Sequence, residues 1–251
     1  MAKKPAKTDR QAVIDQMRKQ QKGAERRRGA IIVTVCVVIA LGIVAAAVIP
    51  IAKDKWDARK YSSKALDEIG VPASTCQKIT TQKADGNQQH VPEGQTVDYT
   101  TAPPAFGAHW NVAGLAPASF AKKFYTEQDR PALEALVHNL EHGYTILWYD
   151  KTIADDADQL AEIEAISKKF GDTNFRDKFI AAPWTSSDEN GKKFPSGTHV
   201  AFTHWSAGGN GVTDATKQVG AFQYCSDVSG EALQKFMDTY PYTDSPEPAA
   251  M

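Results

Sequence analysis

The sequence is poor in cysteine and methionine, and each shortage excludes a class of site. Its 251 residues include three cysteines and four methionines. Cys36, Cys76 and Cys225 form no C-x-x-C pair, which argues against a cysteine zinc site or a dithiol redox motif. No methionine lies near a histidine motif, so a copper(I) site is not expected either.

Basic residues are scarce outside one short region. Residues 1–28 carry ten Lys and Arg against three acids, and the rest of the chain carries 19 basic and 27 acidic residues. Because no basic face recurs after residue 28, nucleic-acid binding is not expected. A basic tail beside an apolar run is instead typical of a topology signal with some attraction for anionic lipid.

Charged side chains are absent from residues 29–52. Twenty-four residues of helix are long enough to cross a hydrocarbon core of about 30 Å. A cleaved signal peptide is the alternative, with small residues at Ala45, Ala46 and Ala47. We expect an uncleaved transmembrane helix, because signal-peptide apolar regions run only about 7–15 residues. The positive charge before it predicts a cytoplasmic N-terminal tail, residues 1–28, and an extracytoplasmic C-terminal part.

The sequence after residue 52 predicts one extracytoplasmic domain that contains both helices and strands. We expect a juxtamembrane helix and linker over 53–74, with Trp56 and Tyr61 near the lipid headgroups. The domain is expected over 75–240, followed by a poorly ordered Pro-rich tail over 241–251. Residues 75–128 favour turns and short extended pieces. Helices are expected at 129–142 (capped by Asp129), 154–170 and 230–240 (capped by Ser229), and strands at 144–149, 179–182 and 199–205. The 144–149 strand is expected to be central. This alternation predicts an α+β or α/β fold.

The cysteines fit an exported domain. Cys76 and Cys225 lie near its two ends, so we expect them to form a disulfide, worth on the order of 4 kcal/mol in the chain-entropy model. Cys36 lies in the apolar run and is interpreted as a small hydrophobic residue.

The segment HNLEH, residues 138–142, has the H-x-x-E-H pattern of some zinc hydrolases. In that chemistry His138 and His142 would hold a metal, and Glu141 would take a proton from bound water. The spacing allows all three side chains to share one helix face. A structural alternative stays open, because the helix dipole favours histidine at a C-terminus. A hydrolase also needs a third, usually acidic ligand, for which the sequence singles out none of Glu162, Glu164 and Glu231.

Four further histidines lie outside the tail: His90, His109, His199 and His204. Two or three of them converging on HNLEH would make a nitrogen-rich site suited to zinc or copper(II). Hydrogen-bonded core histidines are the alternative. His199 and His204 differ by an odd number within a strand, so at most one of them can join any single cluster.

The motifs resemble a known family. HVPEGQTVDYTTAPPAFGAHW (90–110), followed by ALVHNLEHGYTILWY (135–149), is similar to the domain of unknown function 3105 family, which is common among actinobacterial membrane proteins. The resemblance covers most of residues 75–240. It marks His90, Tyr99, Pro103, Pro104, Gly107, His109, His138, Asn139, Glu141, His142 and Gly143. Phe106 departs from the pattern, since a serine precedes the turn glycine in the family, and a hydroxyl that could orient a ligand is therefore missing.

The resemblance implies an accessory role rather than an activity. Proteins similar to this one occur as accessory subunits of actinobacterial supercomplexes that join cytochrome bc complex to cytochrome c oxidase. Small residues in the apolar run, Gly42 and Ala45 to Ala47, would let another membrane helix approach. We therefore predict a non-enzymatic accessory or assembly protein, with a metal site at His90, His109, His138 and His142. The alternative is an extracytoplasmic metal-dependent hydrolase that uses Glu141 as general base.

Overall fold

A computed structural model describes residues 6–84, 88–118, 120–171 and 174–250. The chain divides into two compact units, Met1–Trp56 and Asp57–Met251.

Helix α1 (Ala6–Ser62) is one continuous helix of 57 residues. Within the described residues it contains the one helix long and apolar enough to cross a membrane, Arg10–Ile49, by length and composition. It is therefore consistent with a single-pass anchor. The expected juxtamembrane helix is not separate, because residues 53–62 continue α1, and the 3-10 turns η1 (Leu66–Glu68) and η2 (Ala73–Thr75) follow.

One aromatic prediction for this region was wrong. The Tyr61 side chain is not exposed as an interfacial tyrosine would be: it is 3% exposed and packs in the core of the second unit, with its hydroxyl 3.4 Å from Glu162 Oε1. The side chain of Trp56 lies outside the described part of the chain.

The second unit is built on a five-stranded sheet in the order β1-β7-β6-β4-β5, as far as the described residues show. Its strands are β1 (Thr80–Lys83), β4 (Thr145–Tyr149), β5 (Phe179–Pro183), β6 (Val200–Ser206) and β7 (Val219–Cys225). β4 and β5 pair in parallel, whereas β6 pairs antiparallel with both β4 and β7. Since β4 lies between β5 and β6, the prediction of a central strand is confirmed.

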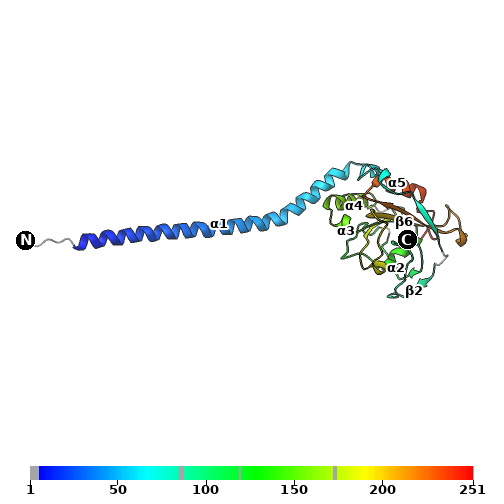
Figure 1. Cartoon of the computed structure of the whole chain (residues 1–251), viewed down its shortest axis with the longest axis horizontal. Helices are drawn as coiled ribbons and strands as arrows, with labels where there is room; N and C mark the ends of the chain where they lie inside the picture. The colour runs from blue at the N-terminus through cyan, green and yellow to red at the C-terminus, as the bar shows by residue number, and fades with distance from the viewer. Residues whose placement is uncertain (1–5, 85–87, 119, 172–173, 251) are drawn as a thin grey trace, which may run out of the picture. The chain divides into compact units, whose positions relative to one another are not determined.

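Helices cover both faces of this sheet, so the predicted mixed α+β class is confirmed. Ile146 and Trp148 on β4 join the core cluster that includes α2 (Leu133–Glu141). Leu147 and Tyr149 join the opposite cluster, with residues of α4 (Ala157–Lys169) and α5 (Gly230–Thr239). In Figure 1, β6 accordingly runs between α5 and α2. Both faces of β4 are buried, which explains its unbroken apolar sequence.

Two helices begin later than predicted, for reasons of capping. Asp129 does not cap α2, because its Oδ1 accepts hydrogen bonds from the backbone and hydroxyl of Thr126 in a turn. The helix expected over 154–170 is α4, which begins at Ala157 because Asp156 caps it, and a separate short helix, α3 (Lys151–Ala154), capped by Asp150, precedes it. Ser229 caps α5 as predicted.

β7 was not predicted, although it pairs with two neighbours. Its second residue is Gly220, where a Cβ would lie 2.5 Å from the ring of Phe106. The glycine makes room for that ring. At the end of β7, Cys225 forms the predicted disulfide with Cys76, and it ties the segment before β1 to the centre of the fold.

The C-terminal tail is packed, contrary to expectation. Lys178, which is 1% exposed, donates from Nζ to the carbonyls of His142, Pro248 and Ala250 at 2.7, 2.9 and 2.8 Å. The buried Asp244 carboxylate accepts from Ser206 Oγ and two backbone amides. A buried cation surrounded by carbonyls fixes the tail where composition alone predicted disorder.

Candidate metal centre

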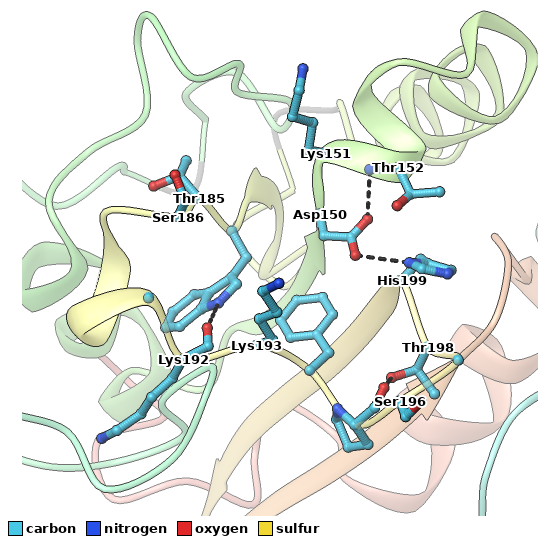
Figure 2. Close-up of a pocket in the computed structure, with 15 residues that line it drawn as sticks. Asp150, Lys151, Thr152, Thr185, Ser186, Lys192, Lys193, Ser196, Thr198 and His199 are labelled. Carbon is cyan, nitrogen blue, oxygen red and sulfur yellow. Dashed lines mark hydrogen bonds and ion pairs between the residues drawn. The ribbon is translucent and has the colours of Figure 1, made fainter.

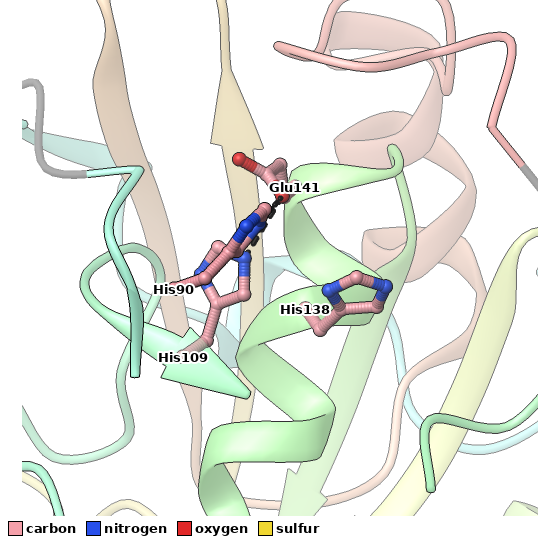
Figure 3. Close-up of side chains that lie close together, drawn as sticks. All are labelled: His90, His109, His138 and Glu141. Atoms are coloured by element: carbon pink, nitrogen blue, oxygen red, sulfur yellow. Dashed lines mark ion pairs between the residues drawn. The ribbon is translucent and has the colours of Figure 1, made fainter. Parts of the chain in front are cut away.

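Strand register brings two distant histidines together. The short strands β2 (His90–Val91) and β3 (His109–Trp110) pair in parallel, with His90 directly opposite His109. In the last turn of α2, His138 and Glu141 are three apart and so share one face. Figure 3 shows these four side chains gathered between the strand pair and the helix.

The polar atoms of the four side chains converge. His109 Nε2 lies 2.9 Å and His90 Nε2 3.8 Å from Glu141 Oε2. One ligand atom from each of His90, His109, His138 and Glu141 lies within 4.8 Å of the others. In a tetrahedral zinc site with bonds of about 2.0–2.1 Å, ligand atoms stand about 3.3 Å apart. Small side-chain movements would therefore close the set around an ion.

Three buried polar atoms at the centre of this group lack a hydrogen-bond partner in the described part of the chain, and a positive charge between them would satisfy all three. His109 Nδ1 lies 2.9 Å from Gly107 O, which can only accept, so Nδ1 carries a proton, and in the neutral form of this ring Nε2 presents a lone pair. That lone pair faces the carboxylate oxygen of Glu141. Among the described residues, His109 Nε2, His138 Nδ1 and Glu141 Oε2 are buried without a hydrogen-bond partner. A cation between them would satisfy all three.

Protonation states suit a metal. Burial, with His142 and His109 nearby, lowers the pKa of His138 to about 4, so its ring is neutral at pH 7. Burial by itself raises the pKa of Glu141, but a proton on His109 Nε2 and the hydrogen bond from Gln88 Nε2 at 2.8 Å lower it overall when no metal is bound. The site thus offers a neutral imidazole at His138 and an ionised carboxylate at Glu141, which are the forms that bind metals.

The four converging side chains are not the four metal ligands that the sequence predicted. His90, His109 and His138 come together as expected, but Glu141, considered only as a general base, takes the fourth place. His142 lies beside this group, with Nε2 3.5 Å from Glu247 Oε2 and its ring 4.2 Å from that of His138. Burial lowers the pKa of His142 as well.

Neither strand histidine joins the cluster. His199 Nδ1 lies 2.8 Å from Asp150 Oδ2, at the edge of a separate cavity of about 380 Å³ (Figure 2). The fully buried His204 lies between the carbonyls of Asp244 and Tyr144, at 2.7 and 3.2 Å. The sequence had allowed at most one of these two histidines to join the cluster, because they are an odd number of residues apart.

Several motif residues support the ligands. Gly107, at φ +135°, lies against the ring of Tyr99, whose hydroxyl donates to Ala108 O at 2.8 Å. This turn aims the Gly107 carbonyl at His109. Gly143, at φ +90°, lets the tail approach α2, because a Cβ there would lie 2.3 Å from Tyr242 O.

Sequence reasoning missed Gln88 and Glu247. Gln88 links Glu141 to Gln218, whose Nε2 donates to Gln88 Oε1 at 2.9 Å. Nothing in the local sequence marks either residue. Gln88 is two residues from His90, and Glu247 lies in the tail that was expected to be poorly ordered.

Comparison with known proteins gives a family and nothing further. A family model described as a protein of unknown function, DUF3105, matches residues 90–251, well over half of the chain. No curated protein and no solved structure matches. The matched region contains all four clustered side chains.

Proposed function

The chain belongs to the DUF3105 family, and we propose that it is a non-catalytic, membrane-anchored accessory protein whose extracytoplasmic domain holds a zinc or copper(II) ion at His90, His109, His138 and Glu141. The observation that carries this proposal is the convergence of four ligand side chains, three of which have a buried polar atom without a hydrogen-bond partner among the described residues. Three imidazoles and a carboxylate, with no sulfur, suit these borderline metals.

A structural or carrier role fits the ligand count better than hydrolysis. Four protein ligands complete the usual coordination of zinc, whereas catalytic zinc sites keep one position for water. In this arrangement Glu141 is a ligand, so it is not free to act as a general base. We therefore favour a non-enzymatic function over the H-x-x-E-H hydrolase.

The anchor supports an accessory role at a membrane. The large apolar side chains of α1 from Ile31 to Ile49 are exposed, so lipid or another membrane protein must cover them. The Cys76–Cys225 disulfide suits an oxidising, extracytoplasmic compartment. With the family resemblance, these features support association with a supercomplex of cytochrome bc and cytochrome c oxidase.

Metal content tests the site. The full chain is purified from its native membranes without chelator or metal-affinity resin. Mass spectrometry should then find about one tightly bound equivalent of zinc or copper per chain. His90→Ala should strongly lower the amount of this tightly bound metal, because it removes one of four ligands. Since the His90 side chain is 44% exposed, this change spares the core.

His199→Ala is the matched control, because His199 lies outside the cluster and should leave the metal content unchanged. If wild type and both variants contain no metal and take up none on titration, the site is a structural hydrogen-bond cluster and the metal proposal fails.

A further inference from the structure

We infer that a second divalent metal ion binds beside the first, held by Glu141, His142 and Glu247, with the carboxylate of Glu141 bridging the two ions. This inference rests on the proposed metal function. It changes the site from a mononuclear centre into a carboxylate-bridged pair.

The second ligand set is assembled from the end of α2 and the C-terminal tail. One ligand atom each from Glu141, His142 and Glu247 lies within 4.8 Å of the others. His142 Nε2 and Glu247 Oε2 are 3.5 Å apart, close to the edge of about 3.3 Å in a tetrahedral zinc site.

Glu141 has the capacity to serve both ions. Its side chain is 1% exposed, its Oε2 has no hydrogen-bond partner in the described part of the chain, and its Oε1 accepts one bond from Gln88. A carboxylate has about four lone-pair directions, so most of its capacity is unused. Two-metal sites place their ions about 3.5–4 Å apart, a separation that one carboxylate can bridge.

Glu247 is held in place by its backbone. Its amide donates to Glu141 O at 3.0 Å, and Lys178 fixes the following residues through the carbonyls of Pro248 and Ala250. Gly143 leaves room for this approach. The Glu247 carboxylate is therefore held beside His142 before any ion binds. This lowers the entropic cost of forming the site.

The two sites differ in character. The second offers one nitrogen and two carboxylates, a harder set than three histidines and one carboxylate. Glu247 is 49% exposed, so water can complete the coordination. We expect zinc to fill the closed histidine site first and this more open site at higher concentration.

Zinc titration of the full chain in detergent, after chelator treatment and buffer exchange, tests the inference. Wild type should bind two equivalents with distinct affinities. Glu247→Gln removes a charged ligand but keeps the side-chain size and the backbone contacts, so it should bind one equivalent with unchanged first-site affinity. Glu93→Gln, which changes an exposed carboxylate three residues from His90, should still bind two. Cobalt(II) absorption provides a second readout.

The outcomes separate the two proposals. One equivalent in both wild type and Glu247→Gln overturns the second site and leaves the first standing. Loss of both ions in Glu247→Gln also overturns it, since Glu247 would then belong to a single site. No binding in any protein overturns both.

Discussion

At the residue scale, the chemistry depends on where one proton sits. Gly107 O fixes a proton on His109 Nδ1, so in the neutral ring Nε2 meets the Glu141 carboxylate as a second acceptor. An acceptor pair 2.9 Å apart is unfavourable unless a cation lies between them or a ring carries an extra proton. The turn that ends in Gly107 therefore prepares His109 to be a ligand.

Acid should destabilise the metal-free protein through its buried histidines. Burial lowers the pKa of His138 to about 4 and also lowers that of His204, while the unfolded chain titrates near 6.5. Between these values the unfolded state binds more protons. Stability is therefore full above about pH 6.5 and falls toward pH 4, by about 1.4 kcal/mol per pH unit for each histidine that titrates.

Urea unfolding of the metal-free protein at pH 7.5 and 5.5 measures this loss. His204→Gln keeps a donor for Asp244 O but does not titrate, so it should make stability less dependent on pH. An unchanged pH dependence in His204→Gln would contradict the assignment for that residue.

At the element scale, the end of α2 is where helix, tail and ligands meet. Gly143 combines φ +90° with a close approach to Tyr242 O. Gly143→Ala should destabilise the fold by about 2 kcal/mol or more, because it adds backbone strain and displaces the tail. Thermal unfolding measures the loss. The displaced tail should also weaken the second metal site more than the first.

Gly211→Ala is the matched control for this change. Gly211 has φ +77°, but no atom of the described residues lies within 4 Å of the position its Cβ would take. It should show the strain alone, so a loss as large as that of Gly143→Ala would mean that the tail contact contributes nothing.

At the scale of the whole molecule, the proposal requires the anchor as well as the domain. The chain should co-migrate with a terminal oxidase on a native gel in mild detergent. Replacing residues 29–52 with an unrelated apolar helix should abolish this, because small residues such as Gly42 would no longer allow close helix packing. Migration of the wild-type chain alone would contradict the supercomplex association.

The sequence by itself determined the apolar helix, the mixed fold class, the disulfide and the central strand 144–149. These follow from local composition and periodicity, or, for the disulfide, from having few cysteines to pair. It also indicated His90, His109 and His138 as candidates, through the motifs around them.

Only the tertiary structure decided which side chains share one centre. The β2–β3 register sets His90 beside His109, and the rotation of α2 points Glu141 rather than His142 into that group. Lys178 and Gly143 hold the tail so that Glu247 reaches His142. These contacts join residues that are far apart along the chain, and local patterns carry no information about such pairings because long-range packing sets them.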